Sequence, residues 1–278
     1  MKRENILKLS ATTLAIIGTG CILFNAAAES VIVAKADQVY TVSTSYQVPA
    51  ASAAALSAPK TNEENNEAVN YQVLVDSLGS ETPTEKDLTM EEAAAASAQY
   101  LKDILGLDLE GAYVYMSYSQ GTVTFPRAFW TASVSFEEIL TPESTRWGCF
   151  IDAVTGELFT ASHSRHLDAN PSLAYDAELA KDDNGYAQLA KQIAEKCNLL
   201  SSPIARVEYG CQGYTGNDPD IAMNVLGENG EIAVISFSRY DQTLLGILTN
   251  SACEVQESAD IKDSDMVEII TSDAQPLK

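Results

Sequence analysis

One short stretch of strict alternation constrains the fold of this chain more than any other feature. Because successive side chains of a β-strand point to opposite faces, alternation of apolar and polar residues indicates a strand with one buried face. The stretch "WTASVSF" alternates in this way, with its apolar residues at Trp130, Ala132, Val134 and Phe136. We therefore expect Trp130 and Phe136 in the core, together with Trp147 on the next strand.

A helix is predicted just before this strand, in "TMEEAAAASAQYLKDILGLD". Thr89 can cap the helix, and Glu92, three residues on, can reach back to complete a capping box. Apolar residues then recur at spacings of three and four, which places them on one face of the helix. They are Ala93, Ala96, Tyr100, Ile104 and Leu107. This helix must therefore lie against another apolar surface, for which the neighbouring strands are the obvious candidates.

A hairpin is predicted in "RWGCFIDAVTGELFTAS", where two runs of strand-forming residues flank the turn "DAVTGE". Gly156 is free to take a positive φ at this turn. Trp147, Cys149 and Ile151 share one side of the first strand, whereas Phe150 lies on the other. If one face of the sheet is open, Phe150 is a candidate contact surface, although the rest of the protein could also cover it.

The same order of elements recurs later in the chain. A second helical stripe falls in "NGYAQLAKQIAEKCNLL", and strand-like "IARVEYG", "IAMNVLG", "IAVISFS" and "LLGILT" follow. Gly121 precedes Trp130 by nine positions, and Gly213 precedes Ala222 by nine. The pattern predicts an α+β fold of two similar units, residues 89–166 and 167–253, each a helix packed on an antiparallel β-sheet.

The N-terminal residues 1–36 have the layout of an export signal: a positive leader, an uncharged apolar segment and small residues. Cleavage after Ala28 or Ala36 is preferred, and an uncleaved membrane anchor is the alternative. A lipid anchor on Cys21 is disfavoured because Gly18 stands where a large aliphatic residue is needed. All readings place the rest of the chain outside the cytoplasm, either secreted or anchored to the membrane by this segment.

Two further segments have the composition of unfolded chain. Residues 37–88 are interpreted as a low-complexity linker, within which "NYQVLVDSL" could still pack against the first unit, and residues 254–278 as an acidic disordered tail. The net charge of the chain is −22. Such a charge repels nucleic acid and anionic membranes, so we expect no nucleic-acid partner, membrane contact only through the N-terminal segment, and a preference for basic partners.

Four cysteines follow the leader, and four cysteines allow three pairings that sequence alone does not distinguish. They are Cys149, Cys197, Cys211 and Cys253. Cys149 and Cys197 lie on apolar faces of their predicted elements, where a thiol is an ordinary core residue. If any pair is oxidised, Cys211 with Cys253 is the preferred one.

Candidate chemistry is sparse. The only two histidines, His163 and His166, have Asp168 nearby and could in principle supply zinc ligands. The H-E-x-x-H arrangement of metalloproteases is absent, however, and a surface loop is the simpler interpretation. Arg165 adds to a small basic spot there. No nucleophile elbow, phosphate-binding loop or dinucleotide fingerprint occurs. We therefore predict no enzyme, no cofactor, and no catalytic, cofactor-binding or metal-binding residue.

The helix, the Trp-led strand "WTASVSF" and the strand and turn "FIDAVTGEL" together resemble the PepSY family of small extracytoplasmic domains. The resemblance covers residues 89–166, and residues 183–253 only by layout, since "SRYDQTLLG" replaces the turn motif there. It implies a noncatalytic binding or regulatory module that restrains a secreted peptidase or senses at the cell envelope, with a peptidase or another envelope protein as partner. Asp152, Thr155 and Gly156 then build the hairpin. The alternatives are a metal-dependent hydrolase using His163 and His166, or a cell-surface structural protein.

Overall fold

The computed structural model describes residues 39–40, 70–76, 81–123, 125–138, 140–141, 143–183, 185–256 and 258. The expected signal peptide or anchor lies outside these residues, as do most of the expected linker and most of the expected tail. Within the described ranges, no helix is long and apolar enough to cross a membrane.

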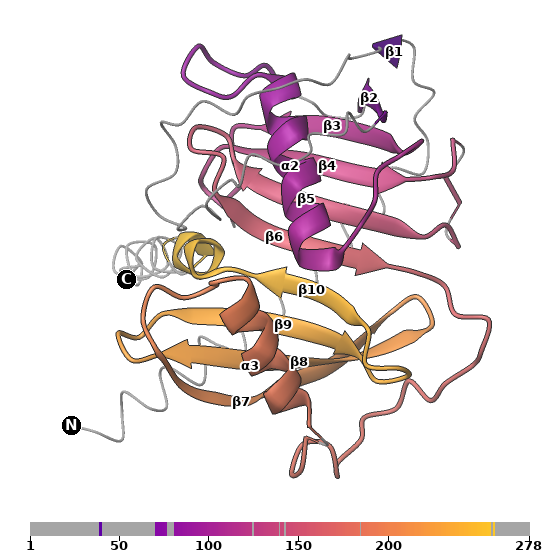
Figure 1. Ribbon diagram of the computed structural model, residues 1–278, viewed down its shortest axis with the longest axis vertical. Coiled ribbons are helices and arrows are strands. Elements are labelled where there is room, and N and C mark those ends of the chain that lie inside the picture. Colours follow the sequence, from indigo (N-terminus) through magenta and orange to yellow (C-terminus); the bar gives the residue numbers. More distant parts are fainter. Residues whose placement is uncertain are drawn as a thin grey trace, which may run out of the picture.

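The described strands form one ten-stranded sheet in the order β1-β2-β3-β4-β5-β6-β10-β9-β8-β7. All neighbouring strands pair antiparallel except β2 and β3, which are parallel. The seam between β6 and β10 joins the earlier strands to the later ones (Figure 1). The strands are β1 (Val39–Tyr40), β2 (Gln72–Val75), β3 (Tyr113–Ser119), β4 (Phe129–Ser135), β5 (Arg146–Asp152), β6 (Leu158–Ser164), β7 (Ile204–Thr215), β8 (Asp218–Gly227), β9 (Ile232–Ser238) and β10 (Leu244–Leu248).

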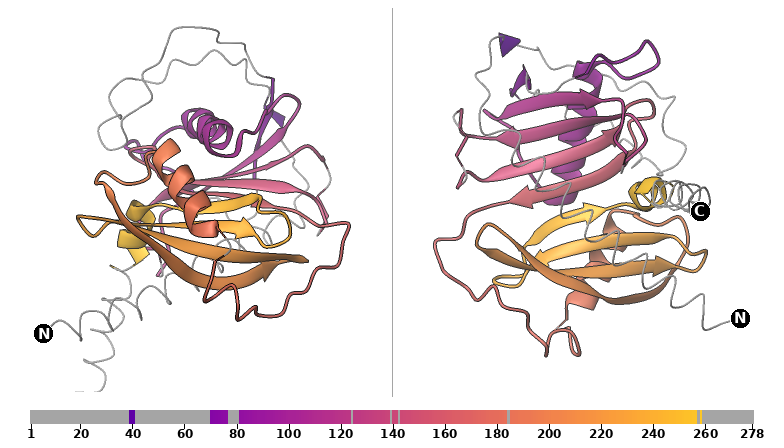
Figure 2. Two further views of the ribbon diagram at one scale, coloured as in Figure 1. Left: turned by 60° about the horizontal axis from the view of Figure 1, so that its bottom comes forward. Right: turned by 180° about the vertical axis from the view of Figure 1, so that it is seen from behind.

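Two helices, α2 (Met90–Leu105) and α3 (Tyr186–Lys196), lie on the same face of this sheet. Figure 1 shows α2 over β3 to β6 and α3 over β7 to β9, and Figure 2 (left) shows both on one side. The expected capping box is present: the Glu92 backbone N–H donates to Thr89 Oγ1 over 3.2 Å, and the Thr89 N–H donates to Glu92 Oε2 over 2.9 Å. The α+β prediction is confirmed.

The main core lies between the helices and the sheet, where Trp130, Ala132 and Val134 are buried as expected. Phe136 is 44% exposed, so its assignment to the core is wrong. The physical reason is that β4 ends at Ser135, and beyond that point the chain leaves the sheet and the alternation no longer sets a face. Phe136 instead packs edge-on against Trp147, with ring centroids 5.6 Å apart. Trp147 itself is only partly buried.

The opposite face of the sheet carries a second apolar cluster, which a helical segment of residues 250–256 covers (Figure 2). Phe150 belongs to this cluster, is only 9% exposed and stacks on Phe129, so it is not the contact surface that its parity suggested. Val255 is buried in the same cluster. The expected disordered tail therefore does not begin at Glu254, because residues 254 to 256 continue this helix. Cys211 and Cys253 pack in the same cluster, and their pairing stays a prediction.

Part of the expected linker is also structured. Strand β2 falls inside residues 37–88 and pairs with β3, with Val73 and Leu74 buried. The Leu88 carbonyl accepts a hydrogen bond of 3.0 Å from the Trp130 indole N–H. The linker assignment is therefore wrong for β2, because the described part of "NYQVLVDSL" pairs with β3 as the alternative expected.

The turn between β5 and β6 has the geometry expected of a glycine hairpin. Gly156 has a φ of 72°, and its N–H donates to the Asp152 carbonyl over 3.0 Å. Asp152 Oδ1 accepts the backbone N–H groups of Val154 and Thr155 at 2.9 and 2.7 Å. Its other oxygen forms an ion pair with Arg127 at 2.5 Å. The turn residues thus have a structural role.

Candidate functional site

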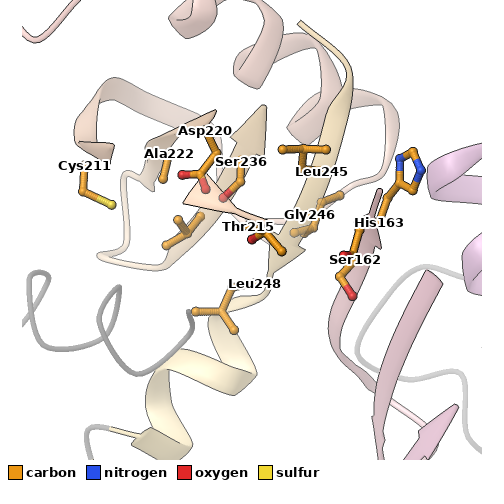
Figure 3. Close-up of a pocket in the computed structure, with 13 residues that line it drawn as sticks. Ser162, His163, Cys211, Thr215, Asp220, Ala222, Ser236, Leu245, Gly246 and Leu248 are labelled. Carbon is orange, nitrogen blue, oxygen red and sulfur yellow. The ribbon is translucent and has the colours of Figure 1, made fainter. Parts of the chain in front are cut away.

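The histidines singled out by the sequence are not assembled into a metal site. The His163 ring stacks on Trp147 with centroids 5.1 Å apart and planes 2° from parallel, and Figure 3 shows it pointing away from Asp220. Burial and the nearby Arg165 lower the pKa of His163. His166 and Asp168 are exposed. Across the described ranges, no group of three His, Cys, Asp or Glu side chains is placed to hold a metal ion.

Arg165, the centre of the expected basic spot, is an internal contact instead. Its Nε donates to Asp218 Oδ2 at 2.8 Å, and its Nη2 donates to Asp241 Oδ1 at 2.7 Å. The hydrogen bond from Arg165 lowers the pKa of Asp241 to about 2. Two carboxylates neutralise the guanidinium, so Arg165 joins β6 to the later strands and offers no positive charge to a partner.

Exposed aromatic side chains gather at one end of the sheet, which we call the aromatic end. Strand register defines this end. Phe136 directly follows β4, at the end of that strand that pairs with the start of β5. The pairing of β6 with β10 extends the same end of the sheet to the later strands. The β7–β8 and β9–β10 turns lie there too. The aromatic end comprises Phe136, Tyr175, Tyr214 and Tyr240, which are 44, 64, 59 and 54% exposed.

The opposite end of the sheet differs in kind. Of the large apolar side chains exposed in the described part of the chain, only Val123 and Val154 lie there, in the loops after β3 and β5. Neither is aromatic. The Arg127–Asp152 ion pair joins the loop before β4 to the turn after β5. Exposed aromatic surface is therefore a property of one end, whereas single exposed valines on loop tips are ordinary.

A groove at the aromatic end combines tyrosine side chains with an arginine. Arg239 forms part of its wall, and its Nη1 donates to the Ala174 carbonyl over 3.1 Å and to Gln212 Oε1 over 2.9 Å. Gln212 and the backbone of Asp176 exchange two further hydrogen bonds of 2.9 and 2.8 Å. The residues that shape the groove are Pro171, Ala174, Tyr175, Pro219, Arg239 and Tyr240.

Hydrogen bonds join the walls of the groove to one another. The segment that carries Tyr175 is bonded to β7 through Gln212 and to the β9–β10 turn through Arg239. Tyr175 also hydrogen-bonds Tyr209 on β7, a contact that, after burial, contributes to raising the pKa of Tyr209 to about 12. Neither a histidine nor a cysteine lines the groove. Its lining suits recognition by apolar contact and hydrogen bonding.

A second concave site lies on the sheet face opposite the helices, at the seam between β6 and β10 (Figure 3). Asp220 is its charged residue, and burial raises the pKa of this carboxyl to about 6. Sequence reasoning missed Asp220, Arg239 and the tyrosines. The only available signal was tyrosine between turn residues, as in "LAYDAE", "GYTGN" and "SRYDQ".

Comparison of the chain with protein-family models, with curated proteins and with solved structures finds no match in any of the three.

Proposed function

We propose that this protein is a noncatalytic binding or regulatory module that acts outside the cytoplasm and holds a protein partner at its aromatic end. The observation that carries the proposal is the presence of four exposed aromatic side chains at one end of the sheet, beside a groove whose arginine is hydrogen-bonded to the neighbouring loop and to β7. Tyrosine, tryptophan and arginine dominate the binding energy of protein interfaces. A groove ordered before binding also reduces the entropy lost on association.

The resemblance of residues 89–166 to PepSY domains supports the same class of function. On that basis the partner is a secreted peptidase or another envelope protein. The proposal of an extracytoplasmic location depends on the charge and hydropathy of residues 1–36, which lie outside the described residues. Cell fractionation with external proteolysis of intact cells is the direct test of location.

We also propose that the protein comprises two similar units. In support, both hairpin turns use the same backbone hydrogen bonds: Gly156 N–H to the Asp152 carbonyl, and Gln242 N–H to the Ser238 carbonyl, each 3.0 Å. The counterpart of Trp130 in the second unit is Ile221. Both side chains face the helices. Trp130 pairs with Ile151 near the end of β5, and Ile221 pairs with Phe237 near the end of β9. Ala222, which the glycine spacing aligned with Trp130, faces the other way, so that alignment is shifted by one residue.

The alternative functions gain no support from the described residues. A hydrolase using His163 and His166 requires both imidazoles at one metal, whereas His163 is stacked on Trp147 and His166 is exposed. A purely structural protein needs no partner-specific groove, and it is distinguished from the proposed module by whether substitutions in the groove abolish a specific interaction.

Site-specific photo-crosslinking in the native host tests the proposal. A photoreactive phenylalanine analogue at Tyr240 should crosslink to a discrete partner, whereas the same analogue at Val123, on the opposite end, should not. The double variant Tyr175→Ser, Tyr240→Ser should weaken binding of the identified partner by about 2 kcal/mol or more, the usual scale for interface hot spots. The matched control is Val123→Ser, Val154→Ser. Equal crosslinking at both ends, or full affinity in the tyrosine variant, would contradict the proposal.

A further inference from the structure

A hollow on the sheet face opposite the helices owes its existence to a row of small residues. Strand register aligns Ser162 on β6 with Gly246 on β10, Gly246 with Ser236 on β9, and Ser236 with Ala222 on β8. These residues lie side by side across four strands. Because none fills the space above the sheet, the face is depressed along this row, and the hollow is centred there (Figure 3).

The walls of the hollow are apolar on one side and polar on the other. Val234 and Leu248 provide apolar surface and belong to the cluster beneath the C-terminal helical segment. Asp220, Ser236 and Thr215 provide oxygen atoms, and Figure 3 shows their side chains gathered in the same part of the hollow. A ligand that fits must therefore carry both an apolar portion and a group that donates hydrogen bonds.

Asp220 is the feature that selects the ligand. Among the described residues it makes no ion pair. The positive charge of Arg239 and a hydrogen bond from the Gly213 backbone N–H favour its charged form, but burial outweighs both. Arg239 Nη1 donates its hydrogen bonds to Ala174 and Gln212 and not to Asp220, and the neighbouring Asp218 is bound by Arg165. A partly desolvated carboxylate that forms no direct ion pair gains from a cation delivered by a ligand.

We propose that this hollow binds a primary alkylammonium group, the chemical class that includes a lysine side chain, with the ammonium on Asp220 and the alkyl chain against Val234 and Leu248. An ammonium has three N–H donors, and the hollow offers three acceptor groups in Asp220, Ser236 and Thr215. The net charge of −22 raises the local concentration of cations. This site is separate from the groove at the aromatic end and does not depend on the function proposed for it.

The pH dependence of binding follows from the raised pKa of Asp220. The carboxyl is protonated below about pH 6, so affinity for the ammonium should fall as the pH drops through about 6. The stability of the unliganded protein should respond in the opposite sense. Because the folded-state pKa of Asp220 is raised, this group adds to the free energy of unfolding below its ordinary pKa of about 3.9. That contribution is lost as the pH rises through about 6. At pH 8 the Asp220→Asn variant should therefore melt no lower than the parent.

The test is titration of the full-length protein, purified in mild detergent, with n-butylammonium chloride at pH 8 and constant ionic strength, followed by calorimetry and amide chemical shifts. n-Butanol, which has the same alkyl chain without the charge, is the matched ligand. Butylammonium should bind at least tenfold more tightly than butanol and should shift the amides of β8, β9 and β10. A blocked lysine, Nα-acetyl-lysine amide, shows whether a peptide side chain is accepted as well as a free amine.

Three variants distinguish a specific site from general attraction to an acidic surface. Asp220→Asn should lose at least tenfold in affinity while melting no lower than the parent at pH 8, which excludes unfolding as the cause. Ser236→Leu should fill the hollow and abolish binding. Asp168→Asn, an exposed carboxyl elsewhere, should bind as the parent does. The proposal is overturned if butanol binds as tightly as butylammonium, if Asp220→Asn keeps its affinity, or if Asp168→Asn loses as much.

Discussion

The two hairpin turns of this protein share a backbone path but differ in the side chains that stabilise it. In the β5–β6 turn, the Asp152 N–H donates to the Glu157 carbonyl over 2.8 Å, and in the β9–β10 turn the Ser238 N–H donates to the Thr243 carbonyl over 2.9 Å. Both turns place a residue with positive φ four positions on, 72° at Gly156 and 62° at Gln242. The comparison teaches that the fold requires this backbone geometry and tolerates different sequences for it.

The electrostatics of the two turns differ more than their backbones. In the first turn, the Asp152 carboxylate accepts hydrogen bonds from two backbone N–H groups of the same turn. It also forms an ion pair with Arg127, whose side chain is 44% exposed. The second turn has Ser238 in the place of Asp152, and Ser238 Oγ donates to Asp218 on β8 over 2.5 Å. Asp218 and Asp241 then share Arg165, which is only 17% exposed. The first turn is stabilised mainly from within, whereas the second is bonded to two other parts of the sheet, Asp218 on β8 and Arg165 after β6.

The largest expected effect comes from breaking the buried network of the second turn. Asp218→Ala removes a carboxylate that is 1% exposed and deprives both Arg165 and Ser238 of a partner. Removing one partner of a buried ion pair costs about 3 to 5 kcal/mol, and we expect the lower figure because Arg165 keeps Asp241. Chemical denaturation measures the loss. The matched variant Asp241→Ala should cost less, since that side chain is 38% exposed. Equal losses would show that the buried carboxylate has no special role.

The next effect tests the glycine of the first turn. Gly156→Val forces a β-branched residue to a φ of 72° and also places a Cβ 3.2 Å from Leu88 Cδ1. Strain of this kind costs about 1 to 3 kcal/mol, so the melting temperature should fall. Any partner binding should weaken only in proportion to unfolding. His166→Ala, an exposed control, should melt as the parent does. A Gly156→Val protein that melts normally but loses binding would make this turn a functional site.

A smaller effect is expected close to the network of the second turn, where His163 stacks on Trp147. The ring contact makes His163→Ala cost about 1 kcal/mol, the scale of an aromatic pair. Because the folded-state pKa of His163 is lowered, its contribution is present above pH 6.5 and is lost as the pH falls through the folded pKa. If His163→Ala leaves the pH dependence of the free energy of unfolding between pH 7 and 5 unchanged, this assignment is refuted.

Local signals in the sequence predicted local structure well. The capping box at Thr89 and the alternation from Trp130 to Val134 depend on residues close in sequence, and both are confirmed. The two helices are also confirmed, but the buried face of each is shifted from the predicted stripe, with Leu101 buried in α2 and Ala190 buried in α3. Phe136 was misassigned because alternation carries no information about where a strand ends. Strand β2 was expected only as an alternative to the linker, because its four residues lie in a polar segment and gain their stability from pairing with β3.

The concave sites could not be predicted because they depend on strand order. Ser162, Gly246 and Ser236 lie in one row only because β10 pairs with both β6 and β9. No spacing in the sequence encodes that neighbour relation. The aromatic end has the same origin, since its side chains come from loops and from the end of β7, which only the register of the strands between them brings to one end. Sequence alone indicated a chain poor in catalytic residues, but not which of its surfaces is concave.

The smallest expected effect reverses the direction of the others and tests the comparison of turns most directly. Gln242 takes a positive φ that disfavours any residue with a Cβ by about 1 to 2 kcal/mol, whereas glycine adopts it freely. Gln242→Gly should therefore stabilise the protein, but by only about 0.5 kcal/mol, because the greater freedom of glycine in the unfolded chain offsets part of the gain. The measurement is a shift in the denaturation midpoint at an unchanged slope. Gln242→Ala, which keeps the Cβ, should give no gain. If Gln242→Gly is instead destabilising by more than about 1 kcal/mol, the Gln242 side chain makes a contribution that glycine cannot replace, and the two turns are not equivalent.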